Sequence, residues 1–252
     1  MQEHTKRPHH GRIDFKGLPN TRDLGGLETV DGRYVRPGLL LRSGALFFAT
    51  SSDIDRLLEE DHLRAVVDLR GDDELAELPD PMDRMPHVSY LHADVLKDAI
   101  EGISQDVAAR ARLEKVHSSD ADPALFMETM YPRILLGESG VASYRALMRR
   151  LLETTDGALL WHCHVGRDRC GMASMLVEQA LGVPMDAMED DYLATNLYTD
   201  VESDERSAAN PRFIRAAVAG VKRAFGSLDG YLHEALGLDD ADLAELRGRY
   251  LE

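Results

Sequence analysis

The sequence predicts an α/β fold, with a central, mostly parallel sheet flanked by helices and a helical C-terminal part. Short apolar runs bounded by turns, such as 65–70 and 158–161, are typical of buried parallel strands. Longer segments repeat apolar residues at helical spacing, as in 141–152 and 172–181. Because strands and helices alternate along the chain, these patterns favour a layered α/β domain.

The length of 252 residues suits one large domain or two small ones. No Gly/Ser-rich or Pro-rich linker divides the chain, so we expect a single domain over residues 13–252. The hydrophobic content of 44% is ample for its core. Residues 1–12 carry several His, Lys and Arg side chains and no apolar core, so we expect a flexible tail there.

The charge and the cysteine count limit the classes of partner and compartment. A net charge of −16 argues against bulk attraction to nucleic acid or to an anionic membrane surface. No segment approaches the roughly 20 apolar residues of a membrane span, so we expect no stable membrane insertion. Two cysteines exclude a disulfide framework and suit a reducing cytosol. We expect a cytoplasmic location, with secretion without a signal peptide as the alternative.

The first half of the chain supplies strands with polar residues at their ends. Residues 20–26 form a turn with an Arg-Asp pair and two glycines, and a short strand then ends at Arg42-Ser43. Strand 65–70 places Asp68 and Arg70 at its carboxyl end, where open α/β sheets bind ligands. We interpret these two residues as a structural ion pair in preference to a catalytic one.

Another predicted strand, 88–92, is followed at once by Asp94. Beyond it, residues 96–136 are polar and helical in pattern, interrupted near Pro123. This segment is either a helical lid over a binding pocket or an ordinary helical insertion. Asp94 is either a functional carboxylate at a strand end or a solvated turn residue.

The strand at 158–161 leads directly into a loop that holds Cys163 and, six positions later, Arg169. An apolar helical pattern begins at Met172. The backbone N–H groups of such a loop, with the first turn of the helix behind it, form a concave anion site. The same positive field lowers the pKa of a cysteine at its base, and an arginine can grip two phosphoryl oxygens.

Residues 162–171 read HCHVGRDRCG and resemble the HC-x-x-G-K-D-R-T-G signature of the cysteine-dependent protein tyrosine phosphatase superfamily. The match is closest to the bacterial tyrosine/serine phosphatases that also act on phosphoinositides. Segments 20–26, 36–43, 190–196 and 226–232 resemble stretches of the same family. The resemblance covers about residue 13 to the end and is weakest over about 96–130. It implies a tyrosine phosphatase-like fold.

The resemblance implies a metal-free phosphomonoester hydrolase without cofactors. Cys163 would attack phosphorus to form a phosphocysteine, while Arg169 and the loop would hold the phosphoryl group. Asp94 would be the general acid, with Asp168 as its rival. Arg22 would either pack under the loop or lie near the bound anion. The residues expected to contact phosphate are His164, Val165, Gly166, Arg167, Asp168 and Arg22.

Two residues of the loop depart from the family pattern. Arg167 replaces a lysine, and it would either steer charged substrates or be a solvated loop residue. Cys170 replaces a hydroxyl residue that assists the catalytic sulfur as a leaving group. Since a thiol is a weak hydrogen-bond donor, we expect slower breakdown of the phosphocysteine. Cys170 would otherwise trap an oxidised Cys163 as a disulfide, or simply fill space.

The predicted function is therefore a protein-tyrosine or dual-specificity phosphatase whose substrates would extend to phosphoinositides. The expected partners are phosphorylated proteins or peptides, or phosphoinositides, with inorganic phosphate bound in the loop and no nucleic acid. Two other classes stay open at this point. One is a phosphate-binding module without turnover, and the other is a thiol enzyme similar to sulfurtransferases or arsenate reductases.

Overall fold

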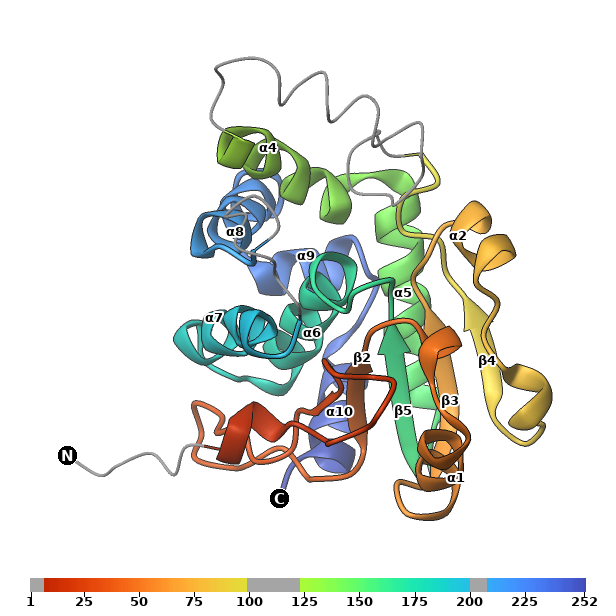
Figure 1. Cartoon of the computed structure of the whole chain (residues 1–252). Coiled ribbons are helices and arrows are strands. Elements are labelled where there is room, and N and C mark those ends of the chain that lie inside the picture. The colour runs from red at the N-terminus through yellow and green to blue at the C-terminus, as the bar shows by residue number, and fades with distance from the viewer. Residues whose placement is uncertain (1–6, 99–122, 200–207) are drawn as a thin grey trace.

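The computed structural model describes residues 7–98, 123–199 and 208–252. Its centre is a five-stranded sheet in the order β1-β2-β5-β3-β4 (Figure 1). Strand β1 is antiparallel to β2, and the other neighbouring pairs are parallel. The predicted mostly parallel sheet is confirmed. The strands are β1 (Arg22–Asp23), β2 (Leu40–Ser43), β3 (Leu63–Asp68), β4 (Ser89–His92) and β5 (Ala158–His162).

The register of the sheet brings polar residues from separate parts of the chain to one edge. At the carboxyl end of β5, His162 pairs with Ser43 of β2 on one side and with Asp68 of β3 on the other. Asp68 in turn pairs with His92 at the end of β4. Since all four strands are parallel, their loops leave from this same edge, and the segment that begins at Cys163 starts in its middle.

Helices cover both faces of the sheet, as predicted. They are α1 (Ser51–Glu59), α2 (Asp72–Glu77), α4 (Pro123–Leu136), α5 (Glu138–Glu153), α6 (Asp168–Leu181), α7 (Met185–Leu193), α8 (Pro211–Phe225), α9 (Leu228–Glu234) and α10 (Asp240–Tyr250). Short 3₁₀ segments lie at Pro8–Gly11, Leu46–Phe48, Met82–Arg84 and Ala194–Leu197.

Alternate residues of β5 divide the core into two clusters. Leu159 and Trp161 join a large cluster built mainly with α4 to α10, whereas Ala158 and Leu160 join a smaller one that includes residues of α1. This alternation follows from the period of two in a strand, which sends successive side chains to opposite faces. The sheet is therefore apolar on both sides, as its parallel strands require.

Helix α6 runs through the interior, next to α7, α9 and α10 (Figure 1). Almost all of its side chains are buried, which is typical of a helix that is apolar around most of its circumference. It starts at Asp168, directly after the cysteine loop, and stops at Gly182, whose φ of 84° is the left-handed conformation that glycine tolerates. The loop is thus anchored at both ends, on β5 and on α6.

The packed part of the chain begins earlier than residue 13. Arg7 forms an ion pair of 2.5 Å with Asp191, and a 3₁₀ turn follows at Pro8–Gly11. Arg12 forms an isolated β-bridge with Arg22. The flexible tail expected over residues 1–12 is thus replaced by packed chain from Arg7 onward, because Arg7 finds a buried carboxylate partner. Residues 1–6 lie outside the described part of the chain.

The segment 96–136 divides into two parts. Residues 99–122 lie outside the described residues, so the lid hypothesis stays a prediction for them. Helix α4 belongs to the core, because it packs along α8 and buries Met130, Tyr131 and Ile134 (Figure 1). The two helices approach closely where Gly220 of α8 lies against Pro132 of α4.

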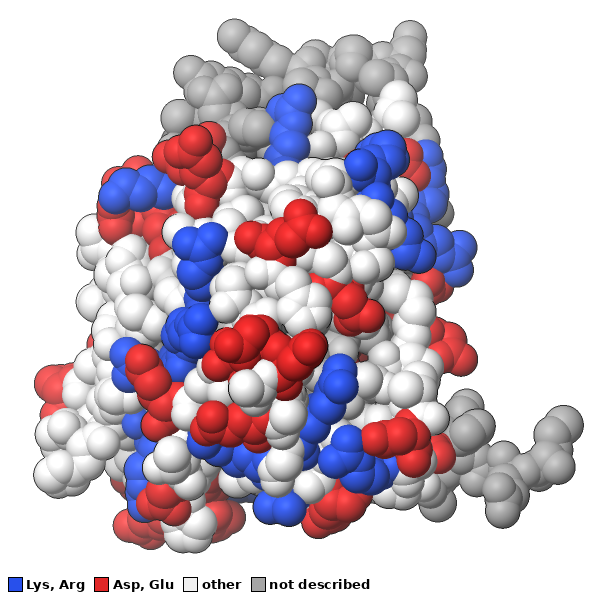
Figure 2. Space-filling model, turned by 180° about the vertical axis from the view of Figure 1, so that it is seen from behind, with Lys and Arg blue, Asp and Glu red and all other residues white. Residues whose placement is uncertain are grey.

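Figure 2 shows the molecule from behind, with acidic and basic side chains interspersed over this face. On this side, the described residues present no broad basic surface of the kind that binds nucleic acid. In the described ranges, moreover, no helix combines the length and the apolar character that crossing a membrane requires.

The contact at Gly220 predicts a stability difference between two glycines in helices. A Cβ at Gly220 would lie 2.7 Å from the ring of Pro132, whereas a Cβ at Gly248 of α10 would meet nothing within 4 Å. We expect Gly220→Ala to lower the free energy of unfolding by about 1–3 kcal/mol through overpacking. Gly248→Ala should raise it by up to about 1 kcal/mol through helix propensity. Urea denaturation of both variants measures this, and equal stabilisation by both would contradict the close helix contact.

Candidate active site

The loop after β5 carries Cys163 at its start and Gly166 at its turn. Gly166 has a φ of 78°, and a Cβ there would lie 2.7 Å from the carbonyl oxygen of Ser43 and 2.9 Å from Nδ2 of Asn20. Both the backbone conformation and the available space therefore require glycine at this position. The loop consequently lies tightly against the ends of β1 and β2.

Three successive carbonyl groups of the loop, those of His164, Val165 and Gly166, are held on the side of β2. Asn20 Nδ2 donates to the carbonyl oxygens of Val165 (3.0 Å) and Gly166 (3.2 Å). Arg42 donates to the same oxygen of Gly166 at 2.8 Å, and the Ala45 amide donates to that of His164.

The N–H groups of the loop must then face the other way. In a planar trans peptide the carbonyl and the following N–H point in opposite directions. The amides of Val165, Gly166 and Arg167 are thus directed away from β2, and within the described residues they donate to no other group. Convergent free amides of this kind form an anion-binding site.

A buried charge cluster behind the loop holds these anchors in place. The carboxylate of Asp191 lies 2.5 Å from the guanidinium of Arg42 and 2.5 Å from that of Arg7. Arg22 donates to the backbone oxygen of Asp191 and to the side chain of Asn20. Burial opposes the ionisation of Asp191, but the three guanidinium groups outweigh it and hold its pKa well below the usual range.

Arg22 is fully buried in this cluster, behind the loop. Its hydrogen bonds go to Asn20 and Asp191, and Asn20 is itself a loop anchor. This geometry does not support Arg22 as a phosphate ligand and favours the alternative of packing under the loop. Asn20, Arg42 and Asp191 were not predicted as site residues, because their role depends on contacts between segments far apart in the sequence.

Cys163 is 2% exposed and lies at the base of the loop. Burial alone would disfavour its thiolate. The thiol of Cys170, the guanidinium of Arg169 and the backbone amide of Cys170 outweigh this and lower the pKa of Cys163 to about 5. A pKa this low favours the thiolate at neutral pH, and the thiolate is the form of cysteine that can act as a nucleophile.

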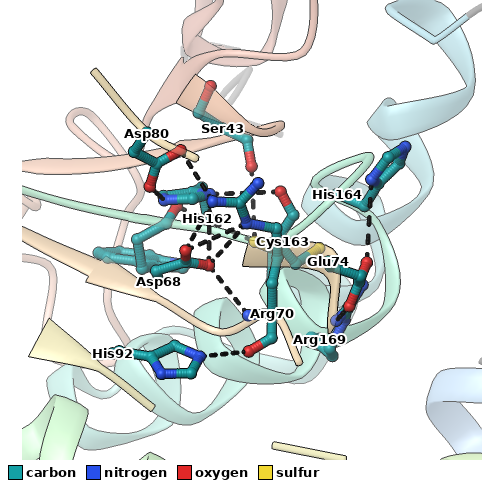
Figure 3. Close-up of polar contacts among 12 residues, drawn as sticks. Ser43, Asp68, Arg70, Glu74, Asp80, His92, His162, Cys163, His164 and Arg169 are labelled. Carbon is teal, nitrogen blue, oxygen red and sulfur yellow. Dashed lines mark hydrogen bonds and ion pairs between the residues drawn. The ribbon is translucent and has the colours of Figure 1, made fainter. Parts of the chain in front are cut away.

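Arg169 is held by Glu74 of α2, a residue that no sequence pattern pointed to. Nη1 of Arg169 lies 2.5 Å from Oε2 of Glu74, and Nη2 lies 2.9 Å from Oε1 (Figure 3). The buried Nε of Arg169 has no partner among the described residues. One edge of the guanidinium is thus fixed by protein, while the edge that carries Nε is free for a bidentate anion.

Asp94, after β4, lies beside this pair. Its carboxylate accepts a hydrogen bond of 2.8 Å from the Leu96 amide. A Cβ built at Gly71 would lie 3.6 Å from Oδ2 of Asp94 and 3.7 Å from Oε2 of Glu74, so both carboxylates lie beside Gly71. Burial raises the pKa of Asp94 above its usual value. A carboxyl group that retains its proton more readily is suited to donating it.

Asp168 has a different environment, although it belongs to the loop itself. Arg167 grips both oxygens of Asp168 at 2.9 and 3.0 Å, and the Tyr131 hydroxyl donates to the same carboxylate. Burial opposes ionisation, but Arg167 and Tyr131 outweigh it and lower the pKa of Asp168. Asp168 is therefore an ionised partner of Arg167, and the guanidinium of Arg167 is occupied by this pair.

Beside Cys163, the polar row at the sheet edge forms a second charge cluster (Figure 3). His162 lies 2.8 Å from Asp80 and 3.3 Å from the carbonyl oxygen of Cys163. Asp68, Asp80 and His162 are spaced closely enough to ligate a metal ion. The cationic position is taken by Arg70, however, which bonds Asp68 at 2.7 Å and Asp80 at 2.9 Å. The structural Asp68–Arg70 pair predicted from the sequence is observed.

A cavity of about 460 Å³ opens beside the loop on the side of His164 and Val165. Its other walls include Leu18, Pro19 and Phe48. The His164 ring packs edge-on against Phe48, and its Nδ1 lies 3.8 Å from Glu74. The mostly apolar lining suits an uncharged organic group attached to an anion in the loop.

Comparison with known proteins shows the family to which the chain belongs. The model of the tyrosine phosphatase family matches residues 13–252, which is nearly the whole chain. The chain therefore belongs to the tyrosine phosphatase family and is a phosphatase, a hydrolase of phosphoric monoesters.

The chain is also similar to individual proteins. A protein of Cupriavidus necator, provisionally named a tyrosine-protein phosphatase, is 31% identical over 96% of this chain and 89% of its own length. The triple specificity protein phosphatase PtpB of Mycobacterium tuberculosis is 25% identical over 93% of this chain and 97% of its own. The crystal structure of P. aeruginosa TpbA covers 90% of this chain and 96% of its own, with a TM-score of 0.45 and 17% identity.

The contact between Glu74 and Arg169 predicts the effect of removing one charge. Glu74→Gln keeps the shape of the side chain but weakens its grip on Arg169, so kcat/KM for para-nitrophenyl phosphate should fall about tenfold or more. Glu77→Gln is the matched control, because Glu77 is exposed on the same helix. Equal activity of the two variants would contradict an orienting role of Glu74.

Proposed function

We propose that the phosphatase works through a phosphocysteine formed on Cys163. The observation that carries this proposal is the position of a thiolate, with a pKa of about 5, next to unpaired loop amides and the free Nε of Arg169. A phosphoryl group has three oxygens to be held and an electrophilic phosphorus to be attacked. The loop offers N–H donors for the oxygens and the Cys163 sulfur as a nucleophile for the phosphorus.

The reaction consists of two displacements at phosphorus. The sulfur of Cys163 attacks, the bond to the leaving oxygen breaks, and Asp94 gives that oxygen its proton. Water then attacks the phosphocysteine, Asp94 takes a proton from the water, and Cys163 leaves as a thiolate. Arg169 and the loop amides of His164 to Asp168 hold the phosphoryl oxygens through both steps. No metal or cofactor is required in this scheme.

Asp94 is preferred to Asp168 as the proton donor on electrostatic grounds. The pKa of Asp94 is raised by burial, whereas Asp168 is held ionised by Arg167 and Tyr131. Asp94 also neighbours the Glu74–Arg169 pair. Asp168 then serves to hold Arg167, and its role as general acid is the rival hypothesis.

For the substrate, we propose phosphotyrosine in proteins or peptides, with dual specificity and phosphoinositide hydrolysis as extensions. The mostly apolar cavity beside His164 and Val165 supports an aryl group more than a charged headgroup. The pairing of Arg167 with Asp168 also removes the cation that would bind a further phosphate. Relatives named tyrosine-protein and triple specificity phosphatases support this range.

Family membership favours this function over the two alternatives drawn from the sequence, a phosphate-binding module and a sulfurtransferase or arsenate reductase. Inorganic phosphate, as the product, is expected to bind the same loop. The cytoplasmic location inferred from charge and cysteine content stays a prediction.

The nucleophile is tested with Cys163→Ser, which removes the thiolate and keeps a similar shape. Hydrolysis of a phosphotyrosine peptide should fall to background, whereas EDTA should leave the wild-type rate unchanged. Rates of phosphate release with matched phosphotyrosine, phosphothreonine and phosphoinositide substrates would rank the substrate classes. Full activity of Cys163→Ser, or its loss on adding EDTA, would overturn the proposed mechanism.

The pH profile separates the two candidate acids. Activity should rise with pH through about 5, as Cys163 loses its proton, and the ionisation of Asp94, whose pKa burial raises above its usual value, should produce an opposing fall. Asp94→Asn should remove the alkaline fall and slow phosphotyrosine hydrolysis by about 10²–10⁴-fold. The loss should be smaller for para-nitrophenyl phosphate, whose leaving group needs little protonation.

Asp168→Asn is the comparison variant. It should lower the rate by releasing Arg167 and Tyr131, yet keep the alkaline fall. The opposite pattern, with the fall lost only in Asp168→Asn, would assign the acid to Asp168.

A further inference from the structure

Two adjacent aromatic side chains are exposed beside the cavity of the candidate active site. They belong to the 3₁₀ segment Leu46–Phe48. Phe47 is 42% exposed and Phe48 is 50% exposed, whereas Leu46 is fully buried. The two exposed rings meet edge to face, with centroids 5.3 Å apart. Single apolar residues are common on protein surfaces, but a contiguous pair beside a binding cavity indicates an interaction site.

The backbone that carries the two rings is firmly held. The amide of Ala45 donates to the carbonyl oxygen of His164 in the anion-binding loop. A Cβ at Gly17 would lie 1.9 Å from the carbonyl oxygen of Phe48, so the two segments pack backbone to backbone. The carboxylate of Asp53 also accepts a hydrogen bond of 2.8 Å from the Gly17 amide. The rings are therefore presented from a fixed position beside the loop, which lowers the entropic cost of binding a partner.

The two rings differ in their relation to the cavity. Phe48 belongs to the cavity wall and faces the His164 ring, with centroids 6.3 Å apart and ring planes at 86°. Phe47 does not line the cavity, so its ring continues the apolar surface beyond the wall. A substrate ring bound beside Phe48 and His164 would leave Phe47 to contact a different part of the same substrate.

The chemistry of this surface favours an apolar partner. Of the described residues that line the cavity, none is Lys, Arg, Asp or Glu. An acidic side chain near the phosphate-bearing residue would find no cation there, and the net charge of −16 would repel it. The same net charge disfavours the anionic surface of a phosphoinositide membrane. A peptide with an apolar side chain is therefore the better occupant.

The spacing of the two rings fits an extended peptide. Side chains on the same side of an extended chain belong to alternate residues, about 6–7 Å apart. The centroids of Phe48 and Phe47 are separated by a similar distance, 5.3 Å. A phosphotyrosine ring placed against Phe48 would thus bring the second residue along the peptide to Phe47, whereas the immediate neighbour of the phosphotyrosine would point away.

We propose that Phe47 and Phe48 form a recognition surface that selects phosphotyrosine peptides with an apolar residue two positions from the phosphotyrosine. Phe48 contacts the aryl ring, and Phe47 covers the apolar side chain. This inference rests on the proposed hydrolysis of phosphotyrosine peptides and adds the sequence context that is preferred. The contact is made in the bound substrate and in the transition state alike, so it lowers KM more than it raises kcat.

The test uses the full-length protein and peptides that carry one phosphotyrosine in a Gly/Ser sequence. Leu or Glu is placed two positions before or after the phosphotyrosine, or directly beside it. For the wild type, kcat/KM should be about tenfold higher with Leu at one of the second positions than with Leu at the neighbouring position, mainly through KM.

Three variants assign this preference to the exposed ring. Phe47→Ala should abolish it, and Phe47→Leu should keep most of it because an apolar side chain remains. Val30→Ala is the control and should retain it in full, since Val30 is 79% exposed but does not line the cavity. Thermal melting of each variant checks that it folds.

The same peptides can be compared without turnover, by fluorescence anisotropy with Cys163→Ser. A preference in binding without hydrolysis by the wild type would uphold the recognition surface and refute the proposed function. Hydrolysis that depends on Cys163 without a preference for Leu at a second position would do the reverse.

Two further results would overturn the proposal. One is a preference for Glu over Leu at the second positions. The other is an effect of Phe47→Ala that appears only with a phosphoinositide in phosphatidylcholine vesicles, and with neither peptides nor dissolved short-chain phosphoinositides. That result would assign the two rings to contact with a membrane surface.

Discussion

The buried ion pair between Arg42 and Asp191 is the interaction on which the anion site depends. Removing two such charges from water costs several kcal/mol per ion. Additional hydrogen bonds from the same two side chains are needed to offset this cost. Arg42 also holds the carbonyl of Gly166, while Asp191 gathers Arg7 and Arg22. Fixing the carbonyls behind the loop leaves the amides in front unpaired. The charge cluster thus holds the loop in an arrangement that suits the binding of an anion.

The other arginines of the site are also bonded by buried carboxylates. Arg169 gives two of its nitrogens to Glu74 and keeps Nε unpaired, and Arg70 is bonded by Asp68 and Asp80 below the cysteine. Each buried guanidinium therefore has a carboxylate partner that fixes its plane. The guanidinium groups differ in whether one of their edges is left without a hydrogen-bond partner. Arg169 has such an edge, which would hold the phosphoryl group in the proposed mechanism. The guanidinium of Arg167 is instead bonded to both oxygens of Asp168.

Local patterns were sufficient to predict the sheet, the helices on both faces and the cysteine loop. Strands 65–70 and 158–161 were recognisable because apolar runs bounded by turns leave few alternatives, and the loop because Cys163 and Arg169 belong to one short segment. The role of Arg22 and the pairing of Arg167 were not predictable in this way. A guanidinium that binds an anion and one that binds Asp191 are identical in the sequence.

The sequence by itself thus determined the class of protein, through a cysteine, an arginine and a helix start placed within ten residues. Only the tertiary structure decided which carboxylate pairs with which arginine. Glu74 is 95 residues away from Arg169, and Asp191 is 149 residues away from Arg42, and each meets its partner through the sheet register and helix packing. Electrostatic roles depend on distances of a few ångströms between such segments, and no local pattern encodes these distances.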